Sequence, residues 1–466
     1  MAEPLWTSQE IIDATGGRLS GAAFAAAGVS IDTRTLEPGD LFVALAGERD
    51  GHEFVAPAMA AGAAGALVSR AGEGSRIVVD DTLKALESMG VAARRRATQA
   101  RRGAVTGSVG KTSVTQAVAA GLALAGPSHA SVKSYNNHIG VPLTLARMPR
   151  GSQRAVFEIG MNHAGEIEPL TRMVAPRAVA ITTVGAVHVE NFPDGESGVA
   201  QAKAEVFAGL TPEGAAILNA DDRWFEYLSG EARKAGGRVV TFGSAEGCHA
   251  RLLDFKAEGE GAVISANLRG RALRFPIRQS GFHWGMNSLA VLLMLEALDV
   301  DLDTGLAALA AFAPLEGRGA ARDIRLKGGG VFTLIDESYN ANPISVTAAL
   351  RTLGARPAKG RRIVALTDML ELGADSPKLH ARLAEPIEAA KVDLVFCAGP
   401  LMQSLWETLP PTRRGGYAQA AAQLEPQVVA AVEPGDVVMV KGSKGSKASM
   451  LAEALAALDS AAGEVG

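Results

Sequence analysis

The stretch GAVTGSVGKTSVTQ, residues 103–116, has the pattern of a phosphate-binding loop between a strand and a helix. An apolar run leads through Gly107 and Gly110 into a lysine, a threonine and a helical segment. The common ATPase pattern has a glycine five residues before Gly110, where this chain has Val105. Because strand, glycine turn, Gly-Lys-Thr and helix all occur in order, we interpret the stretch as a nucleotide site rather than a chance glycine turn.

In such a loop the backbone N–H groups point at phosphate oxygens, and the helix N-terminus adds partial positive charge. Lys111 would reach the β and γ phosphates of the nucleotide, and the Thr112 hydroxyl would ligate magnesium. The residues of the loop that are predicted to bind the nucleotide are Gly107, Ser108, Val109, Gly110, Lys111, Thr112 and Ser113.

The wider pattern predicts an α/β protein of three domains. Residues 1–98 read as a small α/β domain, and residues 99–312 alternate strand-like runs with helical segments around the loop. Residues 250–280 alternate differently and indicate an antiparallel hairpin. After a break at Pro314, Gly317 and Gly319, residues 313–466 again alternate and predict a doubly wound, Rossmann-like domain. The central sheet should be parallel and covered by helices on both faces.

The composition of the chain argues against several classes of protein. The chain has 466 residues, 47% of them hydrophobic, and a formal net charge of -4, so nothing in the overall balance attracts it to nucleic acid or an anionic membrane. Cys248 and Cys397 have no neighbouring Cys or His at metal spacing, which argues against a disulfide framework or a zinc site. The first residues lack a signal pattern and no long uncharged apolar run occurs, so a cytoplasmic protein without a membrane span is expected.

Three polar residues follow the loop at strand ends or in the next helix. Glu158 ends the run RAVFE, where a carboxylate of a parallel strand can meet phosphates and magnesium. His188 in VGAVHVENF repeats this placement, although imidazole is an uncommon magnesium ligand. Lys203 lies in the helical AQAKAEVF. Taken alone, these would be a solvated turn glutamate, a structural histidine and a surface lysine.

Together these motifs resemble the Mur ligases, the ATP-dependent amide-forming enzymes of peptidoglycan precursor synthesis. TGSVGKT, FEIG, VGAVHVENF and AQAKAEVF match the motifs of that family in order and approximate spacing, and the loop looks like the family's own form. DESYNANPISV, LTDMLELGADSPKLH and KGSKGSK are similar to the member that adds D-alanyl-D-alanine to UDP-N-acetylmuramoyl-tripeptide. SIDTRTLEPGDLFVALAGERDGHEF resembles the family's uridine-nucleotide-binding domain.

The resemblance implies ATP and two magnesium ions as cofactors and an acyl-phosphate intermediate. The implied metal ligands are Thr112, Glu158, His188 and Lys203, the last as an N-carbamylated lysine; a salt-bridging lysine is the alternative. Arg318 would reach the γ-phosphate, or else be an exposed linker charge. The implied catalytic residues are Lys111, Glu158, His188, Lys203 and Arg318, and the further nucleotide contacts are Asn287 for adenine and Asp336 for ribose or a metal-bound water.

The two other substrates would bind on either side of the nucleotide. Tyr339, Asn340, Asn342, Lys441 and Ser443 would hold the dipeptide, unless the first three form only an Asn-rich turn. Thr33, Arg34 and Asn137 would bind the UDP-muramoyl-tripeptide, with His52 nearby, although a turn arginine such as Arg34 is commonly just solvated. The protein is expected to be a monomer. Five positions depart from the family pattern, namely Thr183, Trp284, Glu337, Thr367 and Lys444.

Two other functions compete with this interpretation. A folylpolyglutamate synthetase has a similar loop and a carbamylated lysine but lacks a uridine domain, so the 98 residues that precede residue 99 argue against it. The function of a nucleotide switch would not explain Lys203, the SYNANP motif or the last domain. The identity of the third residue of the tripeptide, lysine or diaminopimelate, stays open.

Overall fold

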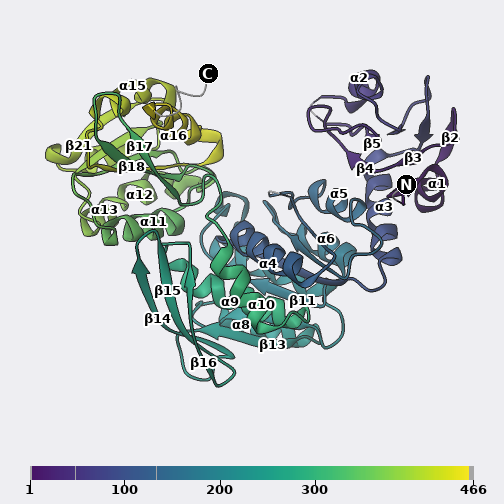
Figure 1. The fold of residues 1–466 in the computed structure, drawn as a ribbon, viewed down its shortest axis with the longest axis horizontal. Helices are drawn as coiled ribbons and strands as arrows, with labels where there is room; N and C mark the ends of the chain where they lie inside the picture. The colour runs from purple at the N-terminus through teal and green to yellow at the C-terminus, as the bar shows by residue number, and fades with distance from the viewer. Residues whose placement is uncertain (1–2, 48, 133, 461–466) are drawn as a thin grey trace.

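The computed structural model describes residues 3–47, 49–132 and 134–460. Their strands form three larger sheets and a two-stranded ribbon of β1 (Trp6–Thr7) with β3 (Ala25–Ala26). Figure 1 shows three units: the N-terminal and C-terminal units lie apart from each other, on the same side of the central one. The predicted α/β class, with a central phosphate-loop sheet between a small N-terminal and a doubly wound C-terminal unit, is confirmed.

The N-terminal unit has a five-stranded sheet in the order β2-β7-β6-β5-β4, which is parallel except for β2. Helix α3 is capped by Asp81 and packs on α5 of the central unit, so that Leu143 and Ala146 join the N-terminal core. This contact fixes the two units against each other. The elements are α1 (Ser8–Thr15), β2 (Arg18–Ser20), β4 (Gly28–Ser30), β5 (Asp40–Val43), α2 (Val55–Ala60), β6 (Gly65–Val68), β7 (Arg76–Val78) and α3 (Thr82–Arg96).

The central unit has a nine-stranded sheet in the order β16-β15-β14-β13-β12-β11-β8-β10-β9. Strands β8 to β13 are parallel, and β14, β15 and β16 form an antiparallel extension of three strands where the sequence predicted a hairpin. Its strands are β8 (Arg101–Thr106), β9 (Ser128–Ala130), β10 (Arg154–Glu158), β11 (Ala178–Ile181), β12 (Ala215–Asn219), β13 (Arg238–Gly243), β14 (Ala250–Glu258), β15 (Gly261–Leu268) and β16 (Arg271–Ile277).

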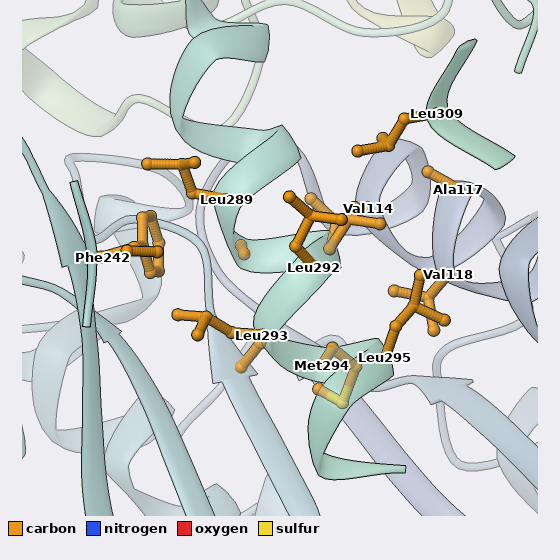
Figure 2. Close-up of a cluster of buried hydrophobic side chains, with 14 of the residues drawn as sticks. Val114, Ala117, Val118, Phe242, Leu289, Leu292, Leu293, Met294, Leu295 and Leu309 are labelled. Carbon is orange, nitrogen blue, oxygen red and sulfur yellow. The ribbon is translucent and has the colours of Figure 1, made fainter. Parts of the chain in front are cut away.

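Helix α9 is apolar on nearly all sides because it is enclosed by its own unit. Its residues Leu292 and Leu295 pack with Val114 and Val118 of α4 and with Leu309 of α10, which holds the phosphate-loop helix against the sheet (Figure 2). The helices of this unit are α4 (Lys111–Ala125), α5 (Gly140–Ala146), α6 (Ile167–Val174), α7 (Glu196–Ala204), α8 (Phe225–Lys234), α9 (His283–Ala297) and α10 (Leu302–Ala311).

The C-terminal unit has a six-stranded sheet in the order β17-β18-β22-β19-β20-β21, parallel except for β17. Helices cover both faces of it, as a doubly wound unit requires. Its elements are β17 (Ala320–Arg325), β18 (Val331–Glu337), α11 (Pro343–Ala355), β19 (Arg362–Thr367), α12 (Ser376–Ala381), α13 (Ala384–Ala389), β20 (Leu394–Ala398), α14 (Gln403–Thr408), β21 (Arg414–Ala418), α15 (Ala421–Ala431), β22 (Val437–Lys441) and α16 (Ala448–Ala456).

Two features that the sequence analysis addressed are visible here. No helix in the described part of the chain is long and apolar enough to cross a membrane. Cys248 and Cys397 are both free thiols, and burial raises the pKa of the Cys397 thiol to about 12, which keeps it protonated and unreactive.

Candidate active site

The phosphate loop joins β8 to α4 in a conformation that only glycine adopts easily. Gly107 has φ 146° and Gly110 has φ 89°. A Cβ at Gly107 would lie 1.9 Å from Thr182 Oγ1, and that hydroxyl donates a hydrogen bond of 2.5 Å to the Val109 carbonyl. The end of the neighbouring strand β11 therefore presses directly on the loop and fixes its shape.

Ser108 connects the loop to the segment that leads towards His188. Its backbone N–H donates to the Thr183 carbonyl at 2.8 Å, and its hydroxyl accepts from the Gly185 N–H at 3.0 Å. His188 follows three residues after Gly185, with φ 57°. The chain after β11 is thus held against the loop by hydrogen bonds rather than by side-chain packing alone.

Lys111 lies over the loop that is predicted to hold phosphates. Its ammonium donates to the Gly107 carbonyl at 2.7 Å. Burial lowers the pKa of Lys111, Glu158 opposes that shift, and Arg318 adds to it. The lysine, the glutamate and the arginine are therefore close enough to interact electrostatically.

Glu158 presents one carboxylate oxygen without a partner. It ends β10 with only 1% of its surface exposed, and its Oε1 accepts from Asn136 Nδ2 at 2.6 Å. Oε2 is buried and has no hydrogen bond within the described chain. A buried carboxylate oxygen without a donor is costly unless a cation faces it, so the site fits a divalent ion.

The described residues contain no group of three or more His, Cys, Asp or Glu side chains that could hold a metal. A cation beside Glu158 would therefore take most of its oxygen ligands from phosphates and water. Magnesium is bound in this way by proteins that use phosphate substrates.

His188 faces the C-terminal unit. Its Nδ1 is in ion-pair contact with the Glu371 carboxylate, which follows β19. Burial lowers the pKa of His188, Glu371 opposes the shift, and the positive charges of Lys111 and Lys203 add to it. The histidine therefore lies within electrostatic reach of both lysines.

Lys203 is the most unusual group of the site. It lies in the last turn of α7 with 3% of its surface exposed, and no hydrogen bond or ion pair to its ammonium is found in the part of the chain that the structure describes. Burial, with a smaller contribution from Lys111, holds the pKa of Lys203 well below its ordinary value. The site thus favours the neutral amine.

Two residues from beyond the central sheet complete this side of the loop. Arg318 Nη2 donates to Thr112 Oγ1 at 3.0 Å, and its guanidinium stacks 4.1 Å from the centroid of the Tyr339 ring. Asn287 of α9 approaches Gly110, where a Cβ would lie 3.3 Å from its Oδ1. The structure therefore brings Arg318 and Asn287 to the loop, beside Lys111, Glu158, His188 and Lys203.

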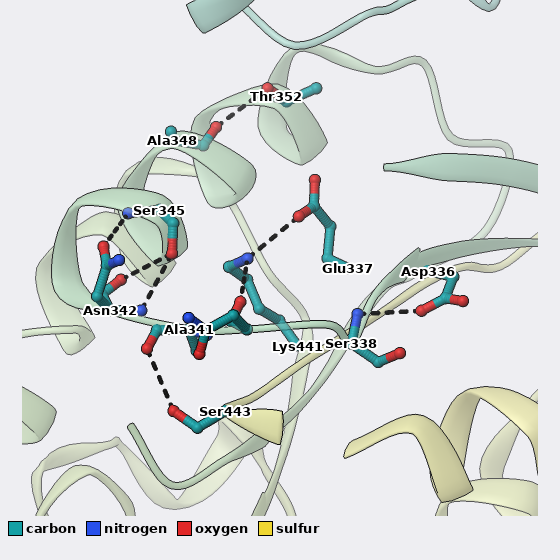
Figure 3. Close-up of polar contacts among 11 residues, drawn as sticks. Asp336, Glu337, Ser338, Ala341, Asn342, Ser345, Ala348, Thr352, Lys441 and Ser443 are labelled. Atoms are coloured by element: carbon teal, nitrogen blue, oxygen red, sulfur yellow. Dashed lines mark hydrogen bonds and ion pairs between the residues drawn. The ribbon is translucent and has the colours of Figure 1, made fainter. Parts of the chain in front are cut away.

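The polar cluster of the C-terminal unit is centred on Lys441 (Figure 3). The buried Lys441 ammonium pairs with Glu337 at 3.1 Å and donates to the Asn340 carbonyl at 3.1 Å. Asn342 accepts from the Ser345 N–H at 2.9 Å and caps α11. Further contacts link Ser338 to Asp336, Ala341 to Asn340, and Ser443 to Ala341. The dipeptide-binding role of these residues stays a prediction.

The predicted uridine-nucleotide residues lie in a different place. Thr33 and Arg34 follow β4, and the exposed Arg34 side chain pairs with Asp32 at 2.6 Å. His52 contacts Asp50 and Ser69 within the same unit. Asn137 Oδ1 accepts from the Gly140 N–H at 2.9 Å, at the start of α5. Among the described residues, none of these four makes a hydrogen bond or ion pair with the phosphate loop.

Four of the positions that depart from the family pattern have local partners. Thr183 donates to Asp222 at 3.0 Å, Glu337 pairs with Lys441, and Thr367 bonds to Ser446 at 2.5 Å. Trp284 is buried and packs on Phe312, with ring centroids 5.7 Å apart. Lys444 is exposed. These substitutions are accommodated by contacts of their own.

Sequence reasoning missed three partners of the site. Asn136 holds Glu158, Thr182 presses on the loop, and Glu371 faces His188. All three contacts join segments that are far apart in the chain, so motif spacing carries no signal for them. Of the three, only Asn136 had a signal in the sequence, because it lies next to Asn137, which was predicted to bind substrate.

Two hollows of about 410 and 600 Å³ lie at the amino ends of the parallel strands of the central sheet, away from the phosphate loop at their carboxyl ends. None of the predicted site residues lines them. Arginines line them, but Arg102 donates to carbonyls at the end of α6 and Arg154 donates to carbonyls at the ends of α4 and α9. Cations there compensate the helix C-termini, which is a structural role.

The fold and the site define a phosphate-loop protein built of three α/β units. Two family models match the chain: the Mur ligase middle domain over residues 105–295 and the Mur ligase, glutamate ligase domain over residues 324–444. The chain belongs to the Mur ligase family, whose members are ATP-dependent amide ligases.

Individual relatives agree with this assignment. A UDP-N-acetylmuramoyl-tripeptide--D-alanyl-D-alanine ligase of Escherichia coli (strain K12) is 35% identical over 84% of this chain and 86% of that protein. A crystal structure of MurF from Acinetobacter baumannii superposes with a TM-score of 0.85 at 27% identity, over 98% of this chain and 99% of that one. A Mycobacterium tuberculosis folylpolyglutamate synthase complexed with ADP has a TM-score of 0.61 at 17% identity over 80% of this chain, which shows a shared fold alone.

Proposed function

We propose that this chain is the ATP-dependent ligase that joins D-alanyl-D-alanine to UDP-N-acetylmuramoyl-tripeptide and forms ADP and phosphate. The observation that carries the proposal is the convergence of Lys111, Glu158 and Lys203 on one phosphate loop, in a chain that resembles such ligases over nearly its whole length. A nucleotide switch would not need the buried lysine or the C-terminal cluster.

The chemistry follows from the substrates. A carboxylate and an amine do not condense in water, so the carboxylate oxygen of the tripeptide first attacks the γ-phosphorus of ATP, giving an acyl phosphate and ADP. The amine of the dipeptide then attacks the acyl carbon, the amine loses a proton, and inorganic phosphate leaves. Because the first step brings two anions together, Lys111 and Arg318 neutralise charge at the phosphates, and the loop N–H groups orient them.

Magnesium fits the donors that the site offers. Thr112 and the unpartnered Oε2 of Glu158 would hold one ion, and His188 would contribute to a second. When bound, such ions neutralise phosphate charge. A neutral imidazole carries no negative charge to balance a dication, so the second position needs a further anionic ligand.

Lys203 supplies that ligand if it is carbamylated. Carbon dioxide adds to the neutral amine, the nitrogen loses a proton, and a carboxylate results. The lowered pKa of Lys203 provides the neutral amine, and the positive charge of Lys111 stabilises the anionic product. We therefore propose N-carbamylated Lys203 as the fourth metal ligand, after Thr112, Glu158 and His188.

The three units would divide the substrates. We assign residues 1–98, with Thr33, Arg34 and also Asn137, to the UDP-sugar; residues 99–312 to ATP, with Asn287 at adenine; and residues 313–466 to the dipeptide. Support for this division is that the N-terminal and C-terminal units lie on the same side of the central unit (Figure 1). Asp336 at the end of β18 would reach the ribose.

Phosphate release tests the function. With ATP and magnesium present, release should require both UDP-N-acetylmuramoyl-tripeptide and D-alanyl-D-alanine, and omission of either should reduce it to background. A folate-type ligase would instead respond to glutamate and a folate. Release that is indifferent to both peptide substrates would contradict the proposal and favour a nucleotide switch.

A further inference from the structure

Tyr339 lies where the C-terminal unit meets the phosphate loop, and it makes three contacts there. Its backbone N–H donates to the Gly317 carbonyl at 3.1 Å, its ring supports the Arg318 guanidinium at 4.1 Å, and its hydroxyl is hydrogen-bonded to Ser134 Oγ. The ring and the hydroxyl are the two parts of this side chain that could bind a ligand. Both already contact other residues of the protein.

The first two contacts hold Arg318 at both ends. Gly317 has φ 68°, and a Cβ there would lie 3.0 Å from Tyr339 Cβ, so the turn that carries Arg318 packs tightly on Tyr339. The head of Arg318 then extends from the ring to Thr112 Oγ1 at 3.0 Å. An arginine has several rotatable bonds, and stacking on an aromatic ring restricts them.

The third contact ties this arrangement to the metal-facing carboxylate. Ser134 lies two residues before Asn136, whose amide holds Glu158 Oε1 at 2.6 Å and whose carbonyl accepts from the Gly160 N–H at 2.8 Å. The hydroxyl of Tyr339 thus docks the C-terminal unit on the segment of the central unit that orients Glu158.

We propose that Tyr339 is a positioning residue: its ring aligns Arg318 towards Thr112, and its hydroxyl seats the C-terminal unit on Ser134, so that arginine and carboxylate reach the nucleotide together. This role rests on the proposed function, because the ligase reaction is the readout. It differs from the dipeptide-binding role predicted from the sequence, in which Tyr339 would contact substrate.

Three substitutions separate the two roles. Tyr339→Phe keeps the ring and removes the hydroxyl, Ser134→Ala removes the hydroxyl partner, and Tyr339→Leu removes both ring and hydroxyl. We expect Tyr339→Phe and Ser134→Ala to lower kcat by the same factor and their double variant to be no worse than either, because all three lose one shared hydrogen bond. Tyr339→Leu should lower kcat further, by roughly 2- to 30-fold, the rate equivalent of a cation–π contact.

The Michaelis constants provide the second readout. A positioning residue leaves the KM for D-alanyl-D-alanine near the wild-type value and lowers kcat. A dipeptide contact would raise that KM in Tyr339→Phe and leave Ser134→Ala unaffected, and this result would overturn the proposal. Additive effects in the double variant would also overturn it. Tyr417→Phe, in the edge strand β21, is the matched control and should leave both constants unchanged.

The outcomes are distinct from failure of the proposed function. If the wild-type protein forms no product from the two peptide substrates, the function itself is wrong. If it does form product and the Tyr339 and Ser134 variants equal the wild type, only the positioning role is wrong.

Discussion

Lys203 is deeply buried, and none of the described residues pairs with its ammonium, which lowers the stability of the folded chain. Its pKa is lowered in the folded chain, so between that value and the ordinary 10.5 the unfolded chain binds more protons. The burial of a charged Lys203 therefore lowers the free energy of unfolding most at low pH. This loss of stability disappears as pH rises through the window. We expect Lys203→Met to raise the free energy of unfolding at neutral pH by about 1–3 kcal/mol and to abolish ligase activity.

Urea unfolding of both proteins across pH, in buffer freed of carbon dioxide so that Lys203 stays an unmodified amine, measures this effect: the stability of the wild type should rise with pH relative to Lys203→Met. A flat difference would contradict the assigned shift. The modification has its own signature, because wild-type protein in ¹³C-bicarbonate should show a carbamate carbonyl resonance that Lys203→Met lacks.

Glu158 Oε2 has no hydrogen-bond partner among the described residues, so the charge of this carboxylate should set magnesium affinity. Glu158→Gln keeps the size of the side chain and an oxygen that can accept from Asn136. We expect the magnesium concentration for half-maximal activity to rise by about 10-fold or more. Glu205→Gln is the matched control, since Glu205 caps α6 by accepting from backbone N–H groups and should affect stability instead. An unchanged magnesium dependence in Glu158→Gln would remove Glu158 from the metal site.

At the level of elements, the loop between β8 and α4 depends on the absence of a side chain at Gly107. A Cβ there would collide with Thr182, and the φ of 146° disfavours any other residue. Gly107→Ala should weaken ATP binding by about tenfold or more, measured by calorimetry. In Gly230→Ala, in α8, the added methyl meets open space, so nucleotide affinity should not change. Equal affinities in wild type and Gly107→Ala would show that the loop does not cradle phosphates.

Elements were predictable to different degrees. The strand, loop and helix around Lys111 follow from local sequence, because glycine conformation and apolar periodicity are local properties. The extension β14–β16 was predicted as a hairpin and has a third strand. The burial of Arg271–Ile277 alternates as in any strand, but Pro276 argues against a strand unless it lies at the edge of a sheet, where β16 is found. The partners Asn136 and Glu371 could not be predicted, because their contacts depend on how distant segments meet.

At the scale of the whole molecule, the site is assembled across units. Arg318 and Tyr339 reach Thr112 and Ser134, and Glu371 reaches His188, so the C-terminal unit contacts the loop, the metal-facing segment and the histidine. Residues 1–98 are fixed to the central unit through α3, which packs on α5. The sequence predicted three units, but their mutual placement is a tertiary property that motif order does not encode.

The mass of the product tests the central claim most directly. Incubation with UDP-N-acetylmuramoyl-tripeptide, D-alanyl-D-alanine, ATP and magnesium should yield a UDP-N-acetylmuramoyl-pentapeptide whose mass equals that of the two peptide substrates less one water. Lys203→Met should yield none. Consumption of ATP without a species of that mass, or formation of it by Lys203→Met at the wild-type rate, would contradict the account.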